Sequence, residues 1–179
     1  GRQALLSNTT GTSNVAMGAA ALDACTTGTY NVALNGSSLG KSTTGYRNIA
    51  IGYKSGGEIT TGYSNIAIGG YNTLDALTTG HSCIAIGEKT GTECTGSSNI
   101  LIGVESAQAL TSGTSNIILG ANKANSLTTG SENIAIGGDP SSATVSNEIT
   151  LGNTAHTKFR IPGLNFSIKD STATNDYVL

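Results

Sequence analysis

The sequence predicts an all-β repeat solenoid, a parallel β-roll or β-helix with about eight coils of 17 residues, and two repeated signals carry this prediction. The first is a unit of the form Asn-Ile-Ala-Ile-Gly, best preserved at 65–69. Further copies start at Asn14, Asn31, Asn48, Cys83, Asn99, Asn116 and Asn133, with a worn ninth copy at Glu148. The first eight start 17 residues apart, except for one step of 18 into Cys83 and one of 16 out of it. Because a residue gained in one coil is lost in the next, the period is structural.

The second signal is a Thr-Thr-Gly or similar turn that precedes each unit, as at 60–62. Glycine supplies turn conformations that other residues adopt only at a cost. Each coil is therefore expected to contain a glycine turn, a polar pair, a short strand and a glycine exit. Coils built in this way bury their apolar edges only against neighbouring coils.

The composition agrees with such a thin, layered core and excludes several partners. The 179 residues include 25 Gly, no Trp and two Phe, and 11% are charged against about 25% in a typical domain. The net charge of −2 comes from scattered residues, which argues against nucleic-acid binding and against an anionic membrane. No apolar run approaches the roughly 18 residues of a membrane-spanning helix, so no membrane insertion is expected.

Side chains alternate along a strand, so that Ile66 and Ile68 share one face and Ala67 lies on the other. We expect the Ile face to form the core of each coil, closed from across the coil by the apolar residue before the turn, such as Ile59. The opposite face would then be an exposed apolar stripe, which soluble monomers seldom carry. A parallel homotrimer around an axis along the rod would cover it. The expected trimer interface is Ala50, Ala67, Ala85, Leu101, Ile118 and Ala135.

The residue after the turn glycine is aromatic in three adjacent coils, at Tyr46, Tyr63 and His81. These rings should stack about 4.8 Å apart, the spacing of neighbouring strands. Two interpretations remain open: the rings contact the sugars of a host glycan, or they form a ladder that stabilises the turn. The asparagines that begin the repeat units form a column along the solenoid, which we call the Asn column. Their side chains are expected to hydrogen-bond from coil to coil rather than to contact a ligand.

No arrangement of residues points to catalysis. Neither His81 nor His156 has an acidic residue and a nucleophile at the spacing of a known catalytic motif, and the sequence contains no glycine-rich phosphate loop. Cys25, Cys83 and Cys94 lack metal-ligand spacing, and Cys25 is expected to be a buried thiol. We therefore expect no enzyme activity, no metal site and no cofactor.

The composition changes at residue 153, which divides the chain into a solenoid at 1–152 and a C-terminal cap and tail at 153–179. Both phenylalanines and several basic residues follow this boundary. We expect 153–170 to cover the open edge of the last coil, as stacked β structures require.

Two resemblances bear on assembly and function. Over about residues 8–152 the Asn-x-Ala-Ile-Gly unit resembles the head repeats of trimeric autotransporter adhesins, although the period of 17 exceeds the usual one of that family. The resemblance implies a left-handed parallel β-roll wound as a trimer. The segments 147–153 and 159–163 are similar to those that precede the self-cleaving C-terminal chaperone of viral tail fibres, tailspikes and endosialidases. That chaperone is absent from the sequence, so no proteolytic residue is assigned.

These observations together predict a structural segment of a viral tail fibre or spike on the virion surface, which presents a binding surface for a host receptor, with a glycan as the expected receptor. The first alternative is the head of a trimeric adhesin on a bacterial surface. The second is an ice-binding protein, because repeated threonines on a flat β surface can match a lattice of ordered water. Against the second, adjacent threonines point to opposite sides of the chain.

Overall fold

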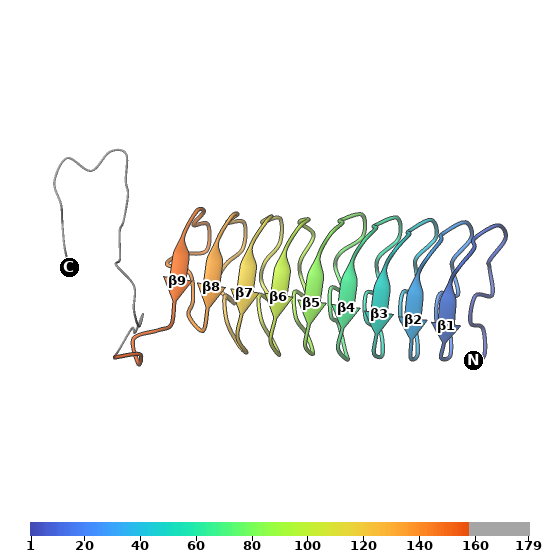
Figure 1. Cartoon of the computed structure of the whole chain (residues 1–179), viewed down its shortest axis with the longest axis horizontal. Coiled ribbons are helices and arrows are strands. Elements are labelled where there is room, and N and C mark those ends of the chain that lie inside the picture. Colours follow the sequence, from blue (N-terminus) through green and yellow to red (C-terminus); the bar gives the residue numbers. More distant parts are fainter. Residues whose placement is uncertain (158–179) are drawn as a thin grey trace, which may run out of the picture.

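The computed structural model describes residues 1–157 and confirms an all-β parallel solenoid. Within these residues the strands form one parallel sheet in which each pairs with the next along the chain, and they stand side by side along the rod (Figure 1). Their bounds are β1 Val15–Met17, β2 Val32–Leu34, β3 Ile49–Ile51, β4 Ile66–Ile68, β5 Ile84–Ile86, β6 Ile100–Ile102, β7 Ile117–Leu119, β8 Ile134–Ile136 and β9 Ile149–Leu151.

The strands are only three residues long because glycines and left-handed residues bound them. Before β4, Ser64 has φ 56°, which turns the chain just ahead of Asn65 and Ile66. After β5, Gly87 has φ 133°, and a Cβ added there would lie 2.7 Å from the carbonyl oxygen of Gly103 in the next coil. The backbones of adjacent coils approach so closely at this column that it is glycine in every coil except the second, where Asn35 has φ 92°.

Equivalent residues of successive coils lie opposite each other throughout the sheet, including across the irregular coil, where Ile66 pairs with Ile84 and Ala67 with Ala85. The extra residue is accommodated at Gly70, beside which nothing lies within 4 Å of an added Cβ. The missing residue is removed from the next turn, where Thr95 stands alone before Gly96. Both changes fall in turns, so the register of the strands is unaffected.

The Asn column forms the hydrogen-bonded ladder that the sequence predicts. Asn48 Nδ2 donates to the carbonyl of Gly62 (2.8 Å), and Asn48 Oδ1 accepts the backbone N–H of Asn65 (3.0 Å). The same pair of bonds recurs at Asn65, with Gly80 (2.9 Å) and the N–H of Cys83 (3.0 Å). Each buried amide thus satisfies two backbone groups that face no strand partner.

The core differs from the sequence prediction, because the two faces of the strands are exchanged. Ala67 is 1% exposed inside the coil, whereas Ile66 and Ile68 point outward and are half-buried. The predicted trimer interface is therefore wrong as a surface. Its members all lie in the core of the single chain, at 0–1% exposure: Ala50, Ala67, Ala85, Leu101, Ile118 and Ala135.

The exchange follows from how thin each coil is. We call the segment of each coil between the glycine after the strand and the next turn the arc. A Cβ added at Gly56, which lies on an arc that faces the sheet, would lie 3.3 Å from Cδ2 of Leu39 and 3.7 Å from Cβ of Ala67. One layer of side chains fills this space, and an isoleucine at every inward position of the sheet would overpack it. Leu101 fits because the arc residue near it is Gly91, where an added Cβ would lie 2.7 Å from Leu101 Cδ1.

The expected buried residues of the opposite wall are confirmed, and they complete the core. The side chains before the turns are fully buried at Cys25, Ile59, Leu77, Leu110 and Leu127. The predicted cap at 153–170 extends past residue 157, outside the described part of the chain, and stays a prediction. Among residues 1–157 no helix is long and apolar enough to span a membrane.

Candidate functional site

One side of the rod is apolar along its whole described length. The first and third residues of β1–β9 are valine, isoleucine, leucine or methionine in every strand, and all point away from the coil interior. We call this surface the outer apolar face. Most of its members in the middle of the rod are half-buried, Ile51, Ile86 and Ile136 are 37–43% exposed, and Met17 and Ile149 near the two ends exceed 60%. Nine strands spaced by about 4.8 Å make this face about 40 Å long.

The predicted aromatic column forms as a stack. The rings of Tyr46 and Tyr63 are parallel within 3°, with centroids 4.9 Å apart, and Tyr63 and His81 are 4.7 Å apart at 12°. Backbone bonds hold the same register, because Ser64 N–H donates to the Tyr46 carbonyl (3.0 Å) and Ser82 N–H to that of Tyr63 (3.1 Å). The geometry is that of a turn-stabilising ladder.

This stacking limits how the column could contact a sugar. Both faces of Tyr63 are occupied by its neighbours, so only ring edges and the outer faces of the end rings remain free. Tyr46 is 37% exposed, and the guanidinium carbon of Arg47 lies 5.8 Å from its ring centroid. Contact of Tyr46, Tyr63 and His81 with a receptor stays a prediction, restricted to these edges and to Tyr46.

Replacing Tyr63 with alanine should lower the free energy of unfolding by about 1–2 kcal/mol, because the change removes both stacked pairs. Denaturant titration at a fixed chain concentration measures the effect. The control is Tyr30→Ala, since Tyr30 is 59% exposed and should change stability by less than about 0.5 kcal/mol. Equal stability of the two variants would show that the stacked rings do not contribute to the free energy of unfolding.

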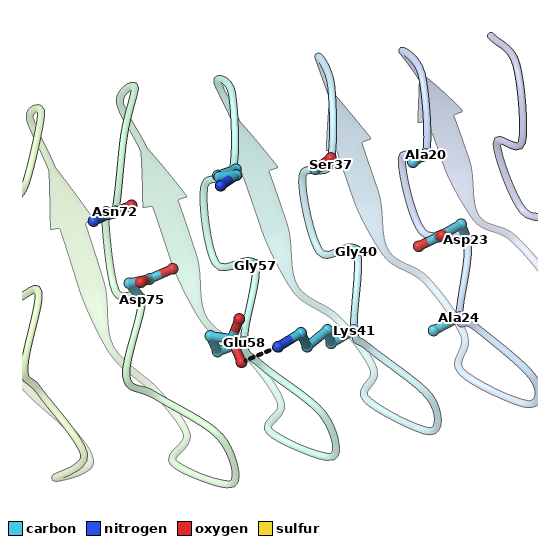
Figure 2. Close-up of a pocket in the computed structure, with 11 residues that line it drawn as sticks. Ala20, Asp23, Ala24, Ser37, Gly40, Lys41, Gly57, Glu58, Asn72 and Asp75 are labelled. Carbon is cyan, nitrogen blue, oxygen red and sulfur yellow. Dashed lines mark hydrogen bonds and ion pairs between the residues drawn. The ribbon is translucent and has the colours of Figure 1, made fainter.

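A shallow groove on the arcs gathers charged side chains from neighbouring coils (Figure 2). Lys41 Nζ and Glu58 Oε2 lie on adjacent coils and are 2.7 Å apart. Both side chains are well exposed, so this ion pair contributes little to stability. Asp23 and Asp75 also line the groove. Burial, and secondarily the negative charge of Glu58, raises the pKa of Asp75 above its ordinary value.

Replacing Asp75 with asparagine should raise the melting midpoint at pH 7 and leave it unchanged at pH 3. The folded state raises the pKa of Asp75, so its ionised form costs stability above that pKa, and the cost disappears once the carboxyl is protonated in both states. Thermal melts at the two pH values test this expectation. A stabilisation that persists at pH 3 would assign the effect to packing instead.

The threonine columns have separate roles in the turn. In most coils the first threonine of the pair donates its hydroxyl to a carbonyl of the next coil, as Thr60 does to Thr78 (3.1 Å) and Thr111 to Thr128 (3.1 Å). The second column, which includes Thr61 and Thr79, is exposed, and Thr78, Thr95 and Thr111 of the first column are exposed as well. Because hydroxyls of the first column, such as those of Thr60 and Thr111, are already bonded within the protein, fewer are free to order water, which argues against the ice-binding alternative.

Among the described residues, no group of three or more His, Cys, Asp or Glu side chains could hold a metal ion. His156 lies apart from His81, where its Nδ1 accepts the N–H of Asn153 (3.0 Å).

Sequence reasoning missed the outer apolar face because it assigned isoleucine to the interior. A signal in the repeat could have revealed the true orientation. Ala33 is followed six positions later by Leu39, whereas Leu101 and Ile118 are followed at the same spacing by Ala107 and Ala124. In these coils the volumes balance, as expected of residues that face each other across one core, whereas Ala50 is followed at this spacing by Gly56 and Ala85 by Gly91.

Comparison with known proteins yields no match to a protein-family model, to a curated protein or to a solved structure.

Proposed function

We propose that this chain is a non-catalytic structural segment of a viral tail fibre or spike, assembled as a parallel homotrimeric rod on the virion surface, where it presents a binding surface for a host glycan. The outer apolar face carries this proposal. A continuous apolar strip about 40 Å long on one side of a narrow rod would stay wet in a single chain.

Parallel assembly uses this face most completely. An axis along the rod sets each strand beside the same strand of its copies, so that Ile66 and Ile68 meet their own counterparts and every level is equivalent. A two-fold axis across the rod would instead oppose β1 to β9. The number of three chains rests on a resemblance: the Asn-x-Ala-Ile-Gly unit of this chain resembles the head repeats of trimeric autotransporter adhesins.

The flanks of the outer apolar face supply the proposed contact surface. Tyr46 and Arg47 precede β3, and Tyr53, with Lys54 Nζ 5.7 Å from its ring centroid, follows it. Exposed aromatic and cationic groups on a rigid backbone suit the rings and anionic groups of a glycan.

Light scattering on the full chain over a range of concentrations tests the assembly. The expected mass is that of three chains, and a mass of one chain at micromolar concentration would refute the proposed rod. A glycan array with the assembled protein then tests contact, with Tyr46→Ala and Arg47→Ala as variants that should lose binding. Turnover of any bound glycan would contradict a structural role.

A further inference from the structure

Two buried thiols meet in the middle of the rod. Cys83 lies directly before β5, and Cys94 closes the arc of the same coil, and both are 0% exposed. Their sulfur atoms lie 3.2 Å and 3.5 Å from one and the same atom, the carbonyl oxygen of Gly96. Asn99 Nδ2 approaches the Cys94 sulfur at 3.5 Å from the next coil.

The sequence reaches this juxtaposition by departing from its own repeat. Cys83 replaces the asparagine of the ladder, whose amide would donate to the turn carbonyl, as Asn65 does to Gly80 (2.9 Å). The turn from Cys94 to Asn99 is the one that has lost a residue.

The coil of Cys25 provides an internal comparison. Asn14 and Cys25 have the same sequence separation as Cys83 and Cys94, and they converge in the same way on the carbonyl of Gly28, at 2.8 Å and 3.8 Å. The convergence is thus a property of the two columns. Only the coil of Cys83 places a thiol in both.

We propose that Cys83 and Cys94 form a disulfide within their coil when the chain folds in the presence of a small-molecule disulfide. This inference concerns the single chain and does not rest on the proposed fibre function. The bond would tie the strand side of the coil to its arc through the core.

In the folded coil, the surroundings shift the pKa values of the two thiols in opposite directions. The hydrogen bond from the Cys94 thiol, with the backbone N–H groups of Asn99 and Ser98, holds the pKa of Cys83 below its ordinary value despite burial. The same thiol–thiol hydrogen bond, with burial, raises the pKa of Cys94. In the closed coil, Cys83 is therefore the thiol that ionises more readily.

The reaction is two successive thiol–disulfide exchanges. The thiolate of one of the two cysteines attacks one sulfur of the small disulfide and releases the first small thiol. The thiolate of the other cysteine then attacks the protein sulfur of this mixed disulfide and releases the second small thiol. The two cysteines lose two electrons and two protons, and the small disulfide is reduced to two thiols. Because both sulfurs are fully buried in the folded coil, the exchange takes place before the coil closes.

Refolding the full chain from denaturant in a mixture of oxidised and reduced glutathione tests the proposal. After an acid quench, thiols are alkylated in denaturant without a reductant, and intact mass and peptide maps are recorded on the folded fraction. The expected result is one alkylated cysteine, Cys25, and a linked peptide pair that contains Cys83 and Cys94. Three alkylated cysteines, a glutathione adduct at either residue, or a link to Cys25 would overturn the proposal.

Three variants are matched to this experiment. Cys25→Ser should retain the link, and its oxidised form should melt at a higher temperature than its reduced form. Cys83→Asn restores the ladder residue, in the arrangement that Asn14 and Cys25 already adopt, and should give two alkylated thiols and no link. Cys94→Leu introduces the residue found at the equivalent position of the next coil, the fully buried Leu110, and should also give no link. With these two controls, at least one link-free variant is expected to fold. A link found only in aggregated material would also refute the inference.

Discussion

Replacing Ile68 and Ile102 with aspartate should convert the proposed trimer into folded single chains. Both side chains lie on the outer apolar face and are half-buried in the single chain, so a carboxylate there can still reach water when the chain is alone. In a parallel assembly the same carboxylates would meet their copies in a dry contact, where each unpaired charge costs several kcal/mol. Light scattering gives the mass, and circular dichroism checks that the β structure is retained.

The matched control is the double variant Thr61→Asp and Thr79→Asp. It adds the same charges at exposed positions, the second threonines of two Thr-Thr-Gly turns. This variant should keep the native mass. An Ile68 and Ile102 double variant with an unchanged mass would place the interface elsewhere on the rod.

A charge on the other side of the same strand should act differently. Ala67 is 1% exposed in the coil core, so Ala67→Asp should prevent folding rather than dissociate folded chains. A folded, dissociated Ala67→Asp chain would contradict the orientation of the strands described above.

Replacing Asn65 with alanine should lower the free energy of unfolding by about 2–5 kcal/mol. The buried amide donates to the Gly80 carbonyl (2.9 Å) and accepts the backbone N–H of Cys83 (3.0 Å). Each buried backbone group that loses its partner costs about 1–3 kcal/mol. Denaturant titration at a fixed chain concentration measures the change, because stability of an assembly depends on concentration.

The control for Asn65→Ala is Thr61→Ala, an exposed position in the preceding turn. It should change stability by less than about 0.5 kcal/mol. A loss below about 1 kcal/mol in Asn65→Ala would mean that the ladder is not a principal source of stability and that water can replace the amide.

The repeat by itself determined the fold class, the positions of the strands and their register. A period of 17 residues brings equivalent residues into line, so the Asn ladder and the stack of Tyr46, Tyr63 and His81 follow once parallel strands are assumed. The irregular steps around Cys83 were also interpretable, because a gain and a loss that cancel must lie in turns.

Only the tertiary structure decided which face of each strand is inside. Alternation along β4 requires Ile66 and Ile68 to oppose Ala67, but it holds equally for either orientation. The choice depends on the width of the coil, which is set by Gly56 and Leu39 on the far wall, and this distance is not encoded in the strand itself. The meeting of Cys83 and Cys94 at Gly96 has the same origin, because a closed turn brings together side chains whose separation along the chain gives no sign of contact.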